Sequence, residues 1–284
     1  MWSPDQIADA LAESLRAHDS LLREEQAVYG LDALGEVALH TIIAHGLSTS
    51  GFGVLREQPY PHEWTRKLRP GTPPAGTPTL RGGRGEQIAP SGESDALPLP
   101  IPRDRQRCDL VLTPQPNQSL DDSLHNEKQR RKDAADLQGT LFESLSTSHL
   151  APGSPHLKSE ISDLRFSVPP ESAFWLELKT LGQYTNTAGL PGPNRKYTTE
   201  LTRNPLADLS KLSADERIHH AAAAIILFTD TKSTARHDLE VLMQRARAKD
   251  LPITISSPHL RHLPIPDRIG NTTCTICLIA LRKE

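Results

Sequence analysis

Apolar side chains recur every three to four positions through the first part of the chain, a pattern that predicts two amphipathic helices. The first is expected at residues 4–22, with Ser3 as its N-cap and Pro4 in its first turn. The second is expected at residues 24–46, ending at Gly46 because glycine commonly follows the last helical residue.

The rest of the chain alternates between short apolar runs, which predict strands, and amphipathic stretches, which predict helices. The predicted strands cover residues 53–58, 108–113, 173–181, 222–229 and 273–282, with 252–257 as a further candidate. The predicted helices cover residues 126–145, 205–221 and a segment from Ser233 or Thr234 to 249. The continuous apolar run at 222–228 is typical of a central strand covered on both faces. This order predicts an α/β fold in which helices flank a mixed central sheet.

Long polar segments separate several of these elements. Residues 66–107, rich in Pro, Gly and Arg, and the polar residues 114–170 predict insertions or long loops. The first insertion is locally basic, with eight Arg and Lys against four Asp and Glu. Residues 182–204 predict a further loop, rich in Gly, Pro, Asn and basic side chains. We expect residues 1–284 to form a single domain that carries these insertions.

Composition narrows the class of protein. The net charge is -3, so any binding to phosphates must depend on local basic patches. The first residues lack the pattern of a signal peptide, and the longest apolar run, 221–228, is too short to span a bilayer. Three cysteines, an odd number, argue against a disulfide framework. We therefore expect an intracellular, cytoplasmic protein without membrane contact.

Cys274 and Cys277 form a CxxC pair, which is a motif of zinc and redox sites. Their surroundings predict a strand, on which residues three apart point to opposite faces. The two thiols are therefore expected to be buried separately and to share no metal.

The candidate chemistry lies in the predicted strand at 173–181. Trp175, Glu177 and Lys179 share one face of this strand, and the alternate leucines face a core. A carboxylate and an ammonium on a half-buried strand are unfavourable unless a ligand or partner uses them. Asp109, an acid in another short apolar strand, supplies a second carboxylate for a divalent cation. An ion pair on an exposed edge strand is the alternative interpretation.

This arrangement resembles the D…ExK signature of the PD-(D/E)XK nuclease superfamily, which includes restriction endonucleases and nucleases of recombination and repair. The resemblance implies a restriction-endonuclease-like fold, whose core is a helix, a three-stranded meander, a helix and a further strand. It implies Asp109 and Glu177 as ligands of Mg²⁺, for which Mn²⁺ can substitute, and Lys179 as the catalytic lysine. It also implies Glu36 as a supporting acid and Gln183 as the glutamine that some members carry shortly after the lysine.

Basic residues near the candidate site suit a nucleic-acid backbone. Arg195 and Lys196 precede Tyr197, an aromatic on which a base can stack, and Arg203 follows them. Lys211, in the predicted helix at 205–221, is a further candidate for a phosphate contact. A solvated loop and a polar helix face are the alternative interpretations.

These features and the resemblance together imply a Mg²⁺-dependent phosphodiesterase. DNA is the preferred substrate with RNA as the alternative, and an endonuclease is favoured with an exonuclease as the alternative. Restriction, defence against phage and other mobile elements, and repair are all compatible settings. Two alternatives stay open. One is the same fold without activity, binding nucleic acid or a protein partner, and the other is an unrelated structural protein with an accidental ExK. A homodimer is compatible with cutting both DNA strands.

Overall fold

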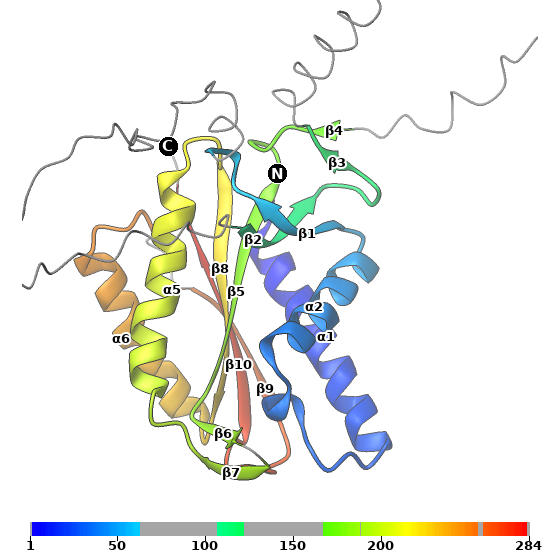
Figure 1. Cartoon of the computed structure of the whole chain (residues 1–284), viewed down its shortest axis with the longest axis vertical. Coiled ribbons are helices and arrows are strands. Elements are labelled where there is room, and N and C mark those ends of the chain that lie inside the picture. Colours follow the sequence, from blue (N-terminus) through cyan, green and yellow to red (C-terminus); the bar gives the residue numbers. More distant parts are fainter. Residues whose placement is uncertain (1, 63–106, 122–166, 188, 255–257, 283–284) are drawn as a thin grey trace, which may run out of the picture.

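A six-stranded sheet forms the centre of the protein (Figure 1). The computed structural model describes residues 2–62, 107–121, 167–187, 189–254 and 258–282. In spatial order, the strands of the sheet are β1 (Gly53–Pro59), β2 (Arg107–Thr113), β5 (Phe174–Gly182), β8 (His220–Thr229), β10 (Thr273–Ala280) and β9 (His259–Pro264). β5 and β8 run parallel, whereas the other neighbours are antiparallel. The predicted mixed sheet is therefore confirmed.

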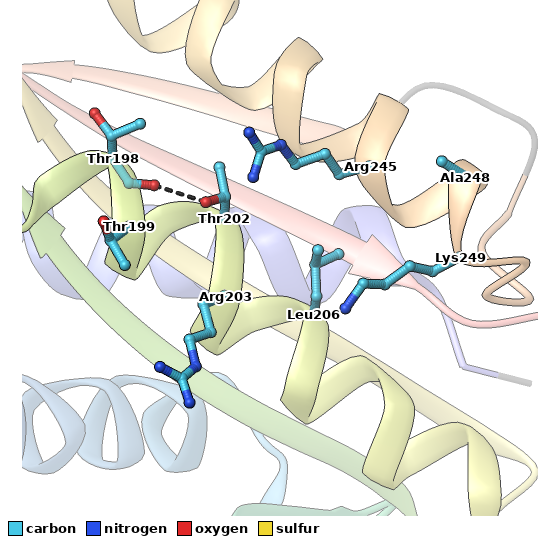
Figure 2. A pocket seen from close by; sticks show the side chains of 8 residues that line it. All are labelled: Thr198, Thr199, Thr202, Arg203, Leu206, Arg245, Ala248 and Lys249. Carbon is cyan, nitrogen blue, oxygen red and sulfur yellow. Dashed lines mark hydrogen bonds between the residues drawn. The ribbon is translucent and has the colours of Figure 1, made fainter.

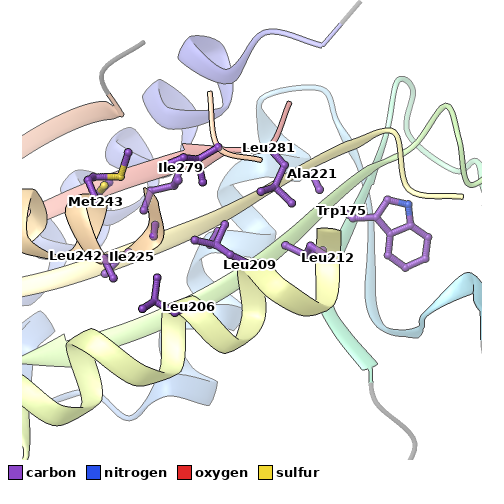
Figure 3. Close-up of a cluster of buried hydrophobic side chains, with 14 of the residues drawn as sticks. Trp175, Leu206, Leu209, Leu212, Ala221, Ile225, Leu242, Met243, Ile279 and Leu281 are labelled. Atoms are coloured by element: carbon purple, nitrogen blue, oxygen red, sulfur yellow. The ribbon is translucent and has the colours of Figure 1, made fainter. Parts of the chain in front are cut away.

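Helices cover both faces of this sheet (Figure 1). α1 (Pro4–Glu24) and α2 (Glu36–Thr49) lie on one face, and α5 (Tyr197–Ala214) and α6 (Lys232–Ala248) lie on the other. Each face has its own apolar core, and Figure 3 shows the core beneath α5 and α6. β8 is the predicted central strand, since all of its residues after the first are buried. Among the described helices, none is long and apolar enough to cross a membrane.

The alternation of side chains along β10 separates the two cysteines of the CxxC pair. Cys274 belongs to the core under α1 and α2, and Cys277 belongs to the core under α5 and α6. Both are free and fully buried. The prediction that the two thiols point to opposite faces is confirmed.

The N-terminal helices differ in how well the sequence predicted them. α1 begins as expected, because the Ser3 Oγ accepts a hydrogen bond from the Gln6 amide at 3.3 Å. The predicted second helix was wrong at both ends. The chain leaves α1 through Gln26, which has a φ of 52°, and α2 begins only at Glu36. Gly46 lies inside α2, where a Cβ would stand 2.2 Å from the Ser14 Cβ, so glycine allows α1 and α2 to approach closely.

The predicted loop at 182–204 was also wrong, because this segment contains regular structure. It holds a hairpin of β6 (Tyr184–Thr187) and β7 (Leu190–Pro193), followed by the start of α5 at Tyr197. Pro205 stands inside α5 rather than at its start. The helix ends at Ala214 and not at 221.

Other predictions were met in part. α6 takes Thr231 as its N-cap, two or three residues before the expected Ser233 or Thr234. Within 252–257, the described residues form only a single bridge, between Ile253 and Leu281, and β9 was not expected. The predicted helix at 126–145 lies outside the described residues, as does nearly all of the insertion at 66–107. Of the insertion at 114–170, the described ends form a short parallel pair, β3 (Ser119–Leu120) with β4 (Ser167–Val168).

Candidate active site

The pairing of β2 with β5 changes at one end, and the candidate site lies there. Backbone pairing runs from Leu112 with Phe174 to Leu110 with Leu176. Two residues farther along β5, the Leu178 amide donates its hydrogen bond to the Asp109 carboxylate, at 2.8 Å from Oδ2. A side chain thus replaces the backbone partner of β5, and Asp109 is held against this strand.

The backbone of β1 is unusual opposite the same point. Its pairs with β2 join Arg56 to Leu110 and Gln58 to Cys108, so Glu57 lies between them, across from Asp109. Glu57 has a φ of 53°, in the left-handed region that residues other than glycine rarely adopt. Such local strain is often found at functional sites.

Glu177 is a deeply buried acid of the site, with 3% of its surface exposed. The Tyr60 hydroxyl donates a hydrogen bond to its Oε1, and the Tyr60 ring stacks on Trp175 with ring centroids 6.1 Å apart. Burial, and then repulsion by the neighbouring Asp109 carboxylate, raise the pKa of Glu177 to about 9. Glu177 and Asp109 therefore resist being ionised together unless positive charge is added between them.

Lys179 lies among carboxylates from three elements. Its Nζ is 3.5 Å from Glu36 at the start of α2, 3.5 Å from Asp208 on α5 and 4.0 Å from Asp109. Burial alone would lower the pKa of Lys179, but the carboxylates, Asp208 foremost, outweigh it and raise the pKa to about 12. The side chain is therefore a cation at neutral pH, which can donate hydrogen bonds and stabilise negative charge but cannot accept a proton.

Asp208 is the member of this cluster to which the sequence had assigned no role. It is 3% exposed, and its Oδ1 accepts a hydrogen bond from the Lys211 Nζ at 2.7 Å. Its Oδ2 is buried and has no hydrogen-bond partner among the described residues, although it faces Lys179. A signal was present, because Asp208 lies seven residues after Leu201 and four before Leu212, on the buried stripe of α5. The wrong start of this helix concealed the stripe.

Of the predicted nucleic-acid contacts, Lys211 lies beside the candidate site, and the others lie elsewhere on the protein. Lys211 joins the cluster through Asp208. Gln183 lies at the far end of β5, about 20 Å from Glu177 at the usual rise per residue, and its side chain accepts a hydrogen bond from the Asp230 amide at 3.0 Å. Arg195 and Lys196 lie between β7 and the start of α5. Arg203, an exposed residue of α5, is among the residues that line a cavity between α5 and α6.

The donor set at the site suits a hard cation held by few protein ligands. Within the described ranges, no group of three or more His, Cys, Asp or Glu side chains is arranged to hold a metal ion. Asp109 and Glu177 are a pair, and Mg²⁺ is commonly bound by one or two carboxylates, with water and substrate phosphate completing its shell. The raised pKa of Glu177 fits such an ion, since added positive charge would favour ionisation of both acids.

In comparisons with known proteins, the chain matches no family model, no curated protein and no solved structure.

Proposed function

We propose that this protein is a metal-dependent nuclease of the PD-(D/E)XK type, which hydrolyses phosphodiester bonds in DNA. The observation that carries the proposal is the meeting of Asp109, Glu177 and Lys179 where the pairing of β2 with β5 changes. Two adjacent carboxylates beside a half-buried ammonium have little purpose in a core, because removing charged groups from water is unfavourable. They suit a site that binds a divalent cation and an anionic phosphate.

The order of elements supports the same proposal. α2 precedes an antiparallel meander of β1, β2 and β5, which is followed by α5 and by β8 parallel to β5. This is the order of helix, three-stranded meander, helix and strand that the resemblance implies. The acids and the lysine lie on the second and third strands of the meander, and Glu36 lies at the start of its helix.

Each residue has a definite task in this proposal. Asp109 and Glu177 would hold the cation, which when bound supplies an activated water and neutralises charge on the phosphate. The Leu178 amide fixes Asp109, and the Tyr60 hydroxyl fixes Glu177. Lys179 would donate to the attacking water or to a phosphate oxygen, as a cation held in place by Glu36 and Asp208.

A cleavage assay with a matched control tests the proposal. The full chain is incubated with circular and linear duplex DNA, single-stranded DNA and RNA, with Mg²⁺, with Mn²⁺ or with EDTA. We expect cleavage of DNA that needs the metal, and cutting of the circle identifies an endonuclease. Lys179→Ala is expected to abolish activity, whereas Lys232→Ala, at an exposed position on α6, is expected to retain it. An intact substrate under every condition, or full activity of Lys179→Ala, would refute the proposal.

A further inference from the structure

A cavity of about 610 Å³ lies between α5 and α6. None of its lining residues belongs to the carboxylate cluster, by which we mean Glu36, Asp109, Glu177 and Asp208 around Lys179. The cavity is lined by Thr198, Thr199, Thr202, Arg203, Leu206, Arg245, Ala248 and Lys249. Figure 2 shows Arg245 and Lys249 extending from α6 toward α5, while Arg203 points from α5 away from α6. We call this feature the α5–α6 cavity. Three cationic side chains and three threonines thus surround one hollow of the surface.

The charge of the α5–α6 cavity is unbalanced. No carboxylate is among its lining residues in the described part of the chain. On the two helices, Asp238 accepts a hydrogen bond from the Tyr197 hydroxyl and Glu200 accepts one from Asn194, and neither acid lines the cavity. A second cavity, under α1, differs in this respect, because its Arg16 and Arg261 pair with acids that line the same cavity. The α5–α6 cavity is therefore suited to an anion that the described residues do not supply.

α5 connects this cavity with the candidate active site. Asp208, which contacts Lys179, and Thr202, which lines the cavity, lie about 120° apart around the helix axis. The short arc between them is the buried face of α5; around the exposed side they are about 240° apart, and Arg203 lies on that side, about 100° from Thr202. Lys211 lies about 12 Å farther along the axis than Arg203, beside the site. α5 thus carries two cations, Arg203 at the α5–α6 cavity and Lys211 beside the candidate active site.

We infer that the α5–α6 cavity binds the phosphate backbone of the nucleic acid whose cleavage we propose, with Arg245, Lys249 and Arg203 as the contacts. The inference rests on the proposed function and names a second binding site for the same substrate. Cations and hydroxyls are the groups that hold phosphates without reading the base sequence. The cavity would thus increase affinity for a long polymer and place the strand across α5, without taking part in hydrolysis.

Binding of DNA in the absence of cleavage tests the inference. A short labelled duplex is titrated with the full-length Glu177→Gln protein in EDTA, over a range of about 50 to 200 mM salt. Arg245→Ala/Lys249→Ala is introduced into this background, and Arg236→Ala/Arg247→Ala is the matched control. The control removes the same charge from the same helix, at exposed residues that do not line the cavity. Circular dichroism establishes that both variants are folded.

We expect the cavity variant to bind more weakly than the control, and its slope of log affinity against log salt should fall by about one for each phosphate that is no longer neutralised. The same two pairs of substitutions are also made in the chain that keeps Glu177. There, hydrolysis of the small diester bis(p-nitrophenyl) phosphate should be equal in both variants, whereas the KM for duplex should rise only in the cavity variant. Equal affinity and slope in the two variants, or no binding of duplex by their parent, would overturn the inference. Absence of hydrolysis in every protein would overturn the proposed function instead, and the binding result would stand by itself.

Discussion

Replacement of Glu177 by glutamine is expected to stabilise the metal-free protein at neutral and alkaline pH. Glutamine has nearly the same shape, so its carbonyl can accept the Tyr60 hydrogen bond and its amide can donate to Asp109. It carries no charge, and the burial that raises the pKa of Glu177 no longer opposes folding. A residue proposed to hold a metal would thus be one that destabilises the fold when the metal is absent.

The sign and size of this effect follow from the pKa shift. The folded chain keeps a proton that the unfolded chain releases, because the pKa of Glu177 rises from 4.5 to about 9 on folding. The contribution of Glu177 to stability is therefore fully present below about pH 4.5 and is lost as the pH rises toward 9. At about 1.4 kcal/mol per pH unit, the loss is on the order of 3 kcal/mol at pH 7. A chain of this size should show a difference in Tm of roughly 2 °C per kcal/mol.

Thermal and urea unfolding from pH 5 to pH 8, in EDTA, measure the effect. Glu177→Gln should be increasingly more stable than the natural chain as the pH rises, whereas Glu240→Gln, at an exposed residue of α6, should follow the natural chain. Addition of Mg²⁺ should stabilise the natural chain, most at the higher pH, and should have little effect on Glu177→Gln. Parallel pH profiles for Glu177→Gln and the natural chain would refute the reasoning.

Three further substitutions test individual contacts. Asp208→Asn removes the largest contribution that raises the pKa of Lys179, so the alkaline limit of cleavage should move to lower pH, and an unchanged pH profile would contradict that role. Tyr60→Phe removes a hydrogen bond that favours ionised Glu177. The affinity for metal, measured by calorimetry, should therefore fall, while cleavage at saturating metal persists. An unchanged affinity would contradict this role of Tyr60. Gly46→Ala forces a Cβ against Ser14 and should lower the free energy of unfolding by about 1 to 3 kcal/mol in urea, whereas a stabilising effect would show that α1 and α2 separate readily.

The elements that the sequence predicted well are those whose burial pattern is uninterrupted. β8 and β10 are apolar runs buried on both faces, and α1 has a regular apolar stripe with a side-chain cap. The errors fell where local signals have two meanings. Gly46 can end a helix or permit close packing of helices, and Pro205 can begin a helix or stand inside one. β9 was missed because most of its residues are only partly buried, so it lacks an apolar pattern.

The candidate site was predictable to the extent that charges stood out from apolar strands. Asp109 and Glu177 are acids at positions where a strand otherwise carries Leu, Val or Trp. Their approach across the long insertion depends on the pairing of β2 with β5, which no local pattern of residues determines. Asp208 could not be recognised in the same way. An acid on a helix face that is predicted to be polar is ordinary until the buried face of α5 is known.

Separate contacts hold the three groups of the candidate site. Asp109 is held by a backbone amide, Glu177 by a buried hydroxyl, and Lys179 by carboxylates from helices on opposite faces of the sheet. Each restraint comes from a different part of the chain. In the proposed function, a cation between Asp109 and Glu177 would offset the repulsion that raises the pKa of Glu177, and the two acids could then be ionised together.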